Sequence, residues 1–476
     1  MIKPRLNHSW LALLLLLIMG QLSANDALHT ALQQHLTSSQ VAGSTLSFAL
    51  WEPTSPEPVY AYHDSLYVIP ASVHKIFTAA TALHHLGQDY QWHTTLAYQG
   101  KLVRGRLEGD LLVIGGGDPT WNEDYWENGA KQLFQNWADS LLTRGITHIE
   151  GNLIANVSHF PTREYNPHWD KDDRPYYYAP AVSSLPFNAN RIIHQFEAGD
   201  KAGDPVKISV IDDYEYFTVE NSLTTGKPNS RLNTWAVPLA DSLSYTLMGT
   251  VPANTKAVEK LALRRPEYFV IKEFREVLEQ NGISVAGQIL VQGNAVDYDQ
   301  LELLFVQDSP HLNSVVSQMV KTSSNFLAES ILHSLAADYD EALRQVGNTL
   351  QELGVGMQNF RFQDGCGLSR DTRLSTREIG ALLYHARIQP WFDAFFSALP
   401  ISGVDGTLSN RMQDNKVKGR VFAKTGGMTG ISTMAGYIQT SDERLLAFAI
   451  LNSGFKNSAH IRQWQDELLG ILCEMY

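Results

Sequence analysis

Hydrophobic and polar residues alternate in two regions near opposite ends of the chain. Residues 44–51 and 59–63 flank a proline-rich turn, which predicts a β-hairpin. Residues 431–438 and 445–451 flank a polar turn and predict a second hairpin, preceded by an extended segment from Val421. We expect the two hairpins to form one antiparallel sheet, with the middle of the chain inserted between them.

Helical spacing replaces this alternation in three places. Apolar residues recur every three or four positions from Val73 to Leu83, which predicts a helix that ends at Gly87. Two further helices are predicted around 315–320 and 326–335, on either side of a break at 323–325. The last apolar stripe, in residues 461–472, predicts an amphipathic helix, and its acidic polar face favours packing on the sheet over membrane anchoring.

The middle of the chain consists mostly of short strand-like runs between turn residues, with a helix predicted at 267–281. We therefore expect a signal peptide (residues 1–24), a catalytic domain (25–90 and 300–476) and a β-rich insert (91–299) with a smaller domain nested near 165–250. The ends of such an insert must lie close together, so deleting residues 91–299 with a short linker could leave the catalytic part foldable. The run Tyr176-Tyr177-Tyr178 is either packed internally or faces a glycan.

Composition narrows the class of protein. Of the 476 residues, 44% are hydrophobic and 18% are charged, as in a folded and soluble chain. The net charge of −13, without any run of lysine or arginine, disfavours nucleic acid as a partner. Cys366 and Cys473 are the only cysteines and no HExxH motif occurs, so we expect no metal site and no cofactor. Whether the two cysteines pair stays open at this point.

The first residues predict export from the cytoplasm. Lys3 and Arg5 precede an apolar run at residues 10–19, and small and polar residues follow at 20–24. This pattern predicts a secretory signal peptide cleaved before Asn25, with an uncleaved anchor as the alternative. No cysteine follows the predicted cleavage site, so we expect neither a lipid anchor nor another stable membrane anchor.

Three short motifs occur in an order and a context that suggest serine chemistry. Ser72-Val73-His74-Lys75 opens the first predicted helix, Ser323-Ser324-Asn325 breaks the helix pair, and Lys424-Thr425-Gly426 lies on a strand before Gly427. A serine hydroxyl is a weak nucleophile and needs a base within hydrogen-bond reach, which a lysine one helical turn away can supply. Lys75 can act as that base only when neutral, and we expect burial and a nearby Lys424 to lower its pKa.

This set resembles the class C low-molecular-mass penicillin-binding proteins, the D-alanyl-D-alanine carboxypeptidase/endopeptidases of peptidase family S13. The spacing of about 250 residues between the first two motifs is similar to that of the family. Residues 116–120, 364–370 and 399–408 also look like family segments, except that Cys366 stands where the family more often has serine. The resemblance covers essentially the whole chain after residue 24.

The resemblance implies a mixed α/β fold of the serine β-lactamase/transpeptidase type, and a periplasmic enzyme without cofactor. The implied substrates are peptidoglycan stem peptides, and β-lactam antibiotics would acylate such an enzyme. Ser72 would be the nucleophile, Lys75 its base and Ser323 the proton carrier, while Asn325 holds Lys75 and the substrate amide. Lys424 and Thr425 would bind the terminal carboxylate of the substrate, and the backbone of Gly426 and Gly427 would also contact it. The N–H groups of Ser72 and Gly427 would form the oxyanion hole. Arg370 would bind a side-chain carboxylate.

Two other classes of protein share parts of this pattern. A class C β-lactamase or a related esterase would have Tyr-x-Asn as its second motif, whereas this chain has Ser323-Ser324-Asn325. A non-catalytic wall-binding protein could retain the fold, although every expected catalytic side chain is present here. Covalent labelling by penicillin would separate a non-catalytic wall-binding protein from the two kinds of enzyme.

Overall fold

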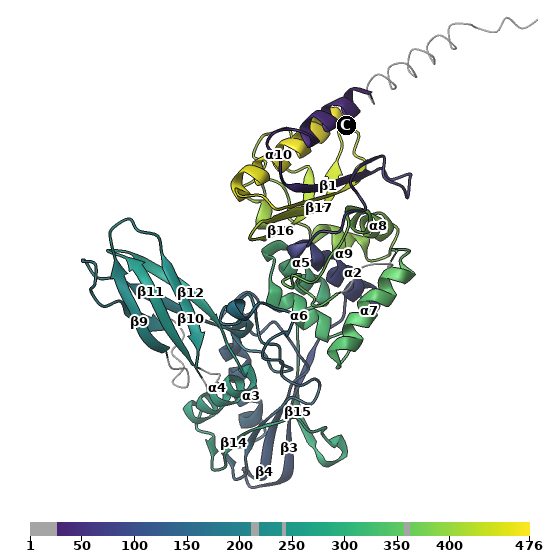
Figure 1. Ribbon diagram of the computed structural model, residues 1–476. Coiled ribbons are helices and arrows are strands. Elements are labelled where there is room, and N and C mark those ends of the chain that lie inside the picture. Colours follow the sequence, from purple (N-terminus) through teal and green to yellow (C-terminus); the bar gives the residue numbers. More distant parts are fainter. Residues whose placement is uncertain (1–25, 211–218, 240–243, 357–361) are drawn as a thin grey trace, which may run out of the picture.

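The computed structural model describes residues 26–210, 219–239, 244–356 and 362–476, and Figure 1 shows that they form three lobes. The predicted signal peptide lies outside the described residues. The upper lobe in Figure 1 contains both ends of the described chain, the lower lobe contains β3 and β4, and the third projects to one side. No helix among the described residues is both long enough and apolar enough to cross a membrane.

A five-stranded antiparallel sheet forms the centre of the upper lobe, in the order β16-β17-β18-β1-β2. Its strands are β1 (Thr45–Trp51), β2 (Tyr60–Tyr62), β16 (Val421–Met428), β17 (Ile431–Gln439) and β18 (Leu445–Ser453). Thr45 of β1 pairs with Ser453 of β18, so the hairpins from the two ends of the chain share one sheet. This confirms the arrangement expected from the alternating pattern.

Because strand side chains alternate between two faces, this sheet packs against helices on both sides. On one face, Phe48 and Leu50 pack with α10 (Ser458–Met475) and with the helical residues 26–36. On the other face, Ala49 and Trp51 pack with the remaining helices of the lobe. These are α2 (Lys75–His85), α5 (Leu312–Thr322), α6 (Asn325–His333), α7 (Tyr339–Glu352), α8 (Thr376–Ala386) and α9 (Phe392–Ser397).

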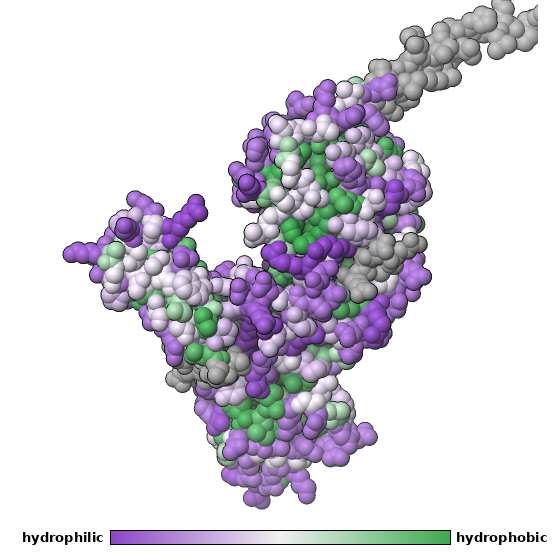
Figure 2. All heavy atoms as spheres, viewed as in Figure 1, coloured by the Kyte–Doolittle hydropathy of each residue, from purple (hydrophilic) through white to green (hydrophobic). Residues whose placement is uncertain are grey.

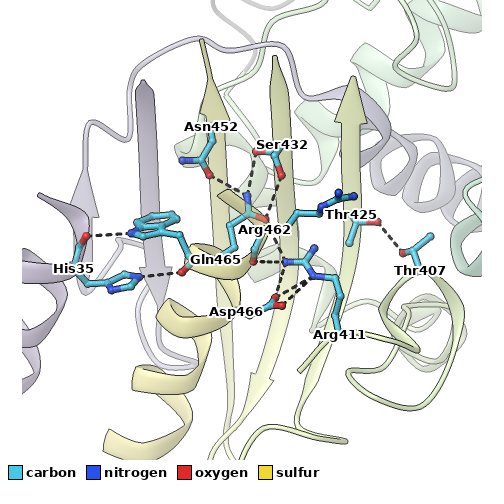
Figure 3. A network of polar contacts seen from close by, with 10 residues as sticks. His35, Thr407, Arg411, Thr425, Ser432, Asn452, Arg462, Gln465 and Asp466 are labelled. Atoms are coloured by element: carbon cyan, nitrogen blue, oxygen red, sulfur yellow. Dashed lines mark hydrogen bonds and ion pairs between the residues drawn. The ribbon is translucent and has the colours of Figure 1, made fainter. Parts of the chain in front are cut away.

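Polar contacts fix α10 on the sheet, as Figure 3 shows. Gln465 is fully buried and donates from Nε2 to Oδ1 of Asn452 on β18 at 2.9 Å. At the edge of the contact, Asp466 forms an ion pair with Arg411 at 2.6 Å. The C-terminal amphipathic helix therefore packs on the sheet, as predicted.

The lower lobe is a mixed sheet in the order β13-β5-β4-β3-β15, with β6 beside β4 and β14 beside β6. Two helices, α3 and α4, pack against it and against each other. The elements are β3 (His93–Val103), β4 (Arg106–Ile114), α3 (Ala130–Thr143), β5 (His148–Ile149), β6 (Leu153–Asn156), α4 (Pro266–Gln280), β13 (Ser284–Val285), β14 (Ile289–Gln292) and β15 (Glu302–Asp308).

Two details of this lobe differ from the sequence-based expectation. The strand β15 pairs with β3, so the sheet of the insert continues past the expected boundary at residue 299. Helix α3 was not predicted, although Leu133, Trp137 and Leu141 recur at helical spacing and are fully buried. The ends of the insert do lie close together, because His93 pairs directly with Asp308.

The projecting lobe consists of two three-stranded sheets, β10-β11-β9 and β12-β7-β8. Their strands are β7 (Arg191–Glu197), β8 (Lys207–Val210), β9 (Val219–Gly226), β10 (Asn233–Pro238), β11 (Tyr245–Pro252) and β12 (Lys256–Ala262). These strands begin and end later in the chain than the nested domain expected near 165–250. Figure 2 shows a notch between this lobe and the upper lobe, with a mostly hydrophilic base.

Candidate active site

Ser72 and Lys75 meet at the start of α2. A single 3-10 turn, Ala71–His74, carries Ser72 and leads directly into the helix at Lys75. From this position Nζ of Lys75 reaches Oγ of Ser72 at 2.9 Å and Oδ1 of Asn325 at 2.6 Å. Its third contact is the backbone oxygen of Cys366 at 2.8 Å. The lysine is thus held by three oxygens, one of which is the predicted nucleophile.

Burial lowers the pKa of Lys75, whose side chain is fully enclosed. The negative charges of Asp364 and Glu329 behind it act in the opposite direction. Cys366 adds no negative charge at neutral pH, because burial raises the pKa of its thiol well above the usual value. Desolvation is thus the main cause of the lowered pKa of Lys75, whereas we had expected a joint effect of burial and Lys424.

The second motif lies at the junction of α5 and α6. Ser323 ends α5 in the left-handed conformation, with φ of 60°, and the hydroxyl of Ser324 caps α6 by accepting from the backbone N–H of Leu327 at 3.2 Å. Asn325 then begins α6 and donates from Nδ2 to the backbone oxygen of Tyr178 at 2.6 Å. This contact orients the amide so that its oxygen faces Lys75. The insert, which supplies Tyr178, thereby helps to position a predicted catalytic side chain.

The third motif lies on β16, beside the second. Nζ of Lys424 donates to Oγ of Ser323 at 2.8 Å and to the backbone oxygen of Thr425 at 2.6 Å. Lys424 is fully buried, and burial together with the nearby Lys75 lowers its pKa well below the usual value. The hydroxyl of Thr425 donates to that of Thr407 at 2.8 Å. All five predicted catalytic residues are thus linked in two directly bonded groups, Ser72–Lys75–Asn325 and Ser323–Lys424.

Gly426 lets the strand lie directly against the start of α2. A Cβ atom at this position would lie 2.7 Å from the backbone oxygen of Pro70 and 3.0 Å from the backbone nitrogen of Ser72. Any larger residue would therefore push β16 away from the nucleophile. The next residue, Gly427, has open space at the same position and borders the cavity.

A cavity of about 730 Å³ opens in front of these groups. Ser72, Ser323, Asn325, Gly427 and Arg370 all line it, whereas Thr425 and Gly426 lie outside its lining. The structure therefore brings Arg370, which lies outside the three motifs, to the same cavity as the predicted nucleophile.

Part of the cavity wall comes from residues that were not predicted as site residues. They belong to the insert: Asn122, Asp124, Tyr125, Asp173, Tyr177, Tyr178, Ala189, Arg191 and Lys260. The only sequence signal among them was the tyrosine run, for which we had considered either internal packing or a surface that faces a glycan. The structure shows both a packed pair of rings and an exposed ring. Tyr176 stacks on Tyr178 at 5.5 Å, while Tyr177 is 42% exposed at the cavity.

A buried acidic layer supports Lys75 from behind. Glu329 accepts from the backbone N–H of Gly365 at 2.8 Å and from the hydroxyl of Tyr339 at 2.9 Å. Asp364 accepts from the indole N–H of Trp169 at 2.8 Å and from the backbone N–H groups of Gly367 and Ser369. Burial, helped by Asp364, raises the pKa of Glu329 to about 7.

Cys366 lies between this acidic layer and Lys75, where its backbone oxygen contacts the lysine and its side chain is buried. Sequence reasoning had placed Cys366 outside the motifs and did not find this contact. Cys473 is also buried, and both cysteines are unpaired in the structure.

Comparison with known proteins identifies the family. The model of the D-Ala-D-Ala carboxypeptidase 3 (S13) family matches residues 28–474. The D-alanyl-D-alanine carboxypeptidase of Actinomadura sp. (strain R39) is 29% identical over 441 residues, which cover 88% of this chain and 79% of that protein. A D-alanyl-D-alanine carboxypeptidase of Haemophilus influenzae is 25% identical over 431 residues, or 88% of each chain.

A solved structure agrees in fold. The crystal structure of penicillin binding protein 4 from Haemophilus influenzae superposes with a TM-score of 0.82 and 24% identity, covering 93% of this chain and 98% of that one. This confirms the expected mixed α/β penicillin-recognising fold. The chain belongs to the S13 family of D-Ala-D-Ala carboxypeptidases and is a serine-type peptidase.

Proposed function

We propose that this D-Ala-D-Ala carboxypeptidase works in the periplasm on peptidoglycan stem peptides, and that it also cleaves the cross-links between them through an acyl-enzyme on Ser72. The observation that carries the mechanism is the 2.9 Å contact between Oγ of Ser72 and Nζ of a fully buried Lys75. A buried lysine with a lowered pKa can take the hydroxyl proton as Ser72 attacks.

The acylation step then follows the contacts of the site. Oγ of Ser72 attacks the carbonyl carbon of the penultimate D-alanine, and its proton moves to Nζ of Lys75. The backbone N–H groups of Ser72 and Gly427 stabilise the oxyanion. As the C–N bond breaks, Ser323 passes a proton to the leaving amine and regains one from Lys424, to which it is hydrogen-bonded at 2.8 Å. Water then attacks the ester and gives a proton through Ser323 to Lys424, while the protonated Lys75 returns its proton to Oγ of Ser72 as the C–O bond of the ester breaks.

Substrate recognition is assigned to the groups around this centre. Lys424, with Thr425 and the backbone of Gly426, would bind the terminal carboxylate of the peptide, and Asn325 would hold its amide. Burial raises the pKa of Asp173, and the charge of Arg370, which lines the same cavity, opposes this shift in part. We assign Arg370 to a side-chain carboxylate of the stem peptide, the role that the family resemblance implies.

Covalent labelling tests the nucleophile. Penicillin should acylate Ser72, and peptide mapping should find the adduct only on the peptide that contains it. Ser72→Ala should abolish labelling, whereas Ser314→Ala, at an exposed position on α5, should label like the wild type. An adduct on another peptide, or undiminished labelling of Ser72→Ala, would overturn the assignment.

Digestion of purified muropeptides tests the substrate. Release of D-alanine from monomeric pentapeptides shows carboxypeptidase activity, and conversion of cross-linked dimers to monomers shows endopeptidase activity. Intact dimers after complete D-alanine release would contradict the second activity alone. Recovery of the protein from the periplasmic fraction, with its N-terminus at Asn25, tests the proposed location.

A further inference from the structure

Two cationic side chains of the projecting lobe line the same cavity as Ser72. They are Arg191, the first residue of β7, and Lys260, near the end of β12. In the antiparallel pairing Arg191 lies opposite Ala262, and Lys260 is two residues from Ala262 on the same strand. The two side chains therefore project from the same face of the sheet as diagonal neighbours, close enough to act on one ligand.

A short series of contacts ties Lys260 to the catalytic residues. The backbone N–H of Tyr177 donates to the oxygen of Lys260 at 3.2 Å, and the next residue, Tyr178, accepts from Nδ2 of Asn325 at 2.6 Å. Nζ of Lys260 also lies 5.6 Å from the centre of the Tyr177 ring. The lysine is thus fixed beside the reaction centre, although it belongs to a different lobe.

Neither cation has an acidic partner. Among the described residues no ion pair involves Arg191 or Lys260, and Nε of Arg191 is buried without a hydrogen-bond acceptor. The carboxylates that line the cavity are Asp124 and Asp173, and Asp173 already accepts from the hydroxyl of Tyr178 at 3.1 Å. Two cationic residues that line one cavity without an acidic partner, one of them with an unsatisfied Nε, suit an anionic ligand.

The backbone before Arg191 adopts an unfavourable conformation. Asn188, Ala189 and Asn190 have φ values of 48°, 51° and 49°, so three consecutive non-glycine residues are left-handed. The buried side chain of Asn190 holds this turn, since Nδ2 donates to the oxygen of Ala181 at 2.7 Å and Oδ1 accepts from the N–H of Phe187 at 2.9 Å. Such strain persists where surrounding contacts enforce it, and it clusters at ligand-binding positions. Here it sets the direction in which Arg191 enters the cavity.

We propose that Arg191 and Lys260 form a second carboxylate subsite, which binds an acidic group of the peptide on the N-terminal side of the residue assigned to Arg370. This inference rests on the proposed function, because it presumes that a stem peptide occupies the cavity. The group in a stem peptide that fits is the free α-carboxylate of its γ-linked glutamyl residue. The projecting lobe would then take part in choosing the substrate.

The test compares two synthetic stem pentapeptides that differ only at the γ-linked glutamyl residue, which carries either its free α-carboxylate or the corresponding amide. Wild-type enzyme should prefer the acid, as measured by kcat/KM for D-alanine release. In Arg191→Gln and Lys260→Gln this preference should fall about tenfold, mainly through KM for the acid. Because the ratio compares two substrates on one enzyme, a general loss of stability or active fraction cancels.

Lys256→Gln is the matched control, since Lys256 lies on the same strand but is 64% exposed and pairs with Glu197. It should keep the wild-type ratio. Equal acid-to-amide ratios in wild type and both variants would overturn the subsite. If Arg191→Gln does not fold, the acid-to-amide ratio of Lys260→Gln alone decides whether the subsite exists. Penicillin acylation of the wild type tests the proposed function separately, so normal acylation with unchanged ratios would reject only the subsite.

Discussion

Lys75 can take part in catalysis in two ways that a substitution can separate. If its role is only to supply positive charge, Lys75→Arg should be nearly harmless, because charge and length are roughly kept. If it must take a proton, arginine cannot replace it, since a pKa above about 12 keeps arginine charged. We expect Lys75→Arg to acylate with penicillin about a hundred to ten thousand times more slowly than wild type.

The control for this experiment is Lys321→Arg. Lys321 forms an ion pair with Asp405 at 2.6 Å, and arginine can keep that contact. Stopped-flow acylation rates, with circular dichroism to verify folding, provide the measurement. A Lys75→Arg rate within about tenfold of wild type would assign the proton transfer to Ser323 or another group.

The buried carboxylate of Glu329 is expected to influence how the rate of penicillin acylation depends on pH. If neutral Lys75 is the reactive form, as we propose, acylation should increase with pH as the lysine loses its proton. The negative charge of Glu329 favours the protonated lysine and thus raises the pKa of Lys75. Glu329→Gln removes this charge and keeps an acceptor for Gly365, so its acylation profile should move to lower pH. The exposed Glu352→Gln, as control, should leave the profile in place; a shift of Glu329→Gln to higher pH would contradict this role.

At the scale of elements, the residue at the break between α5 and α6 is expected to lower the stability of the fold while it serves activity. Ser323 is held left-handed, with φ of 60°, where its hydroxyl contacts Lys424. Ser323→Gly relieves the backbone strain and Ser323→Ala keeps it, while both remove the hydroxyl. We expect the glycine variant to be the more stable by about 1 kcal/mol, or about 1–2 °C in Tm, and both variants to lose most D-alanine release. Equal Tm values would show that the junction is not strained.

Adjacent glycines on β16 offer another matched pair. A Cβ at Gly426 would approach Thr433 Oγ1 within van der Waals distance as well as Pro70, whereas Gly427 has room. Gly426→Ala should therefore lower the free energy of unfolding by about 1–3 kcal/mol, and Gly427→Ala should change it little. Thermal denaturation of the two variants checks this, and equal losses would contradict the close approach of β16 to α2.

The elements of the catalytic lobe that carry the three motifs, together with its sheet, could be predicted from the sequence because their signals are local, whereas α7, α8, α9 and the helical residues 26–36 were not predicted. Alternation predicts β1 and β18, helical spacing predicts α2 and α10, and the motifs lie where these elements begin or break. The cavity wall could not be predicted in the same way. Arg191 and Lys260 are 69 positions apart, and only the pairing of β7 with β12 brings them together. The acidic layer was missed because Glu329 and Asp364 look like ordinary charged residues until their burial is known.

At the scale of the whole molecule, the insert contributes side chains to the hydrophobic core of the catalytic lobe. Trp92, Trp169 and Ala179 all come from the insert, yet they belong to the hydrophobic core around α2. Deleting residues 91–299 would open this core and remove the contacts of Trp169 with Asp364 and of Tyr178 with Asn325. Whether the catalytic part can fold and react without the insert stays a prediction, and these contacts lead us to expect that the deletion would destabilise it.

A smaller change can measure this dependence of the catalytic lobe on the insert. Trp169→Phe keeps most of the apolar volume but removes the indole N–H that donates to Asp364 at 2.8 Å, and the loss of one donor to a buried carboxylate should destabilise the fold by about 1–3 kcal/mol. Because Asp364 also orders the loop whose Cys366 oxygen contacts Lys75, penicillin acylation should slow as well. Trp92→Phe is the control, since its indole N–H donates to Ser334, outside the cavity lining. It should lower Tm similarly without slowing acylation, and equal acylation rates in both variants would show that the insert stabilises the catalytic lobe without tuning its site.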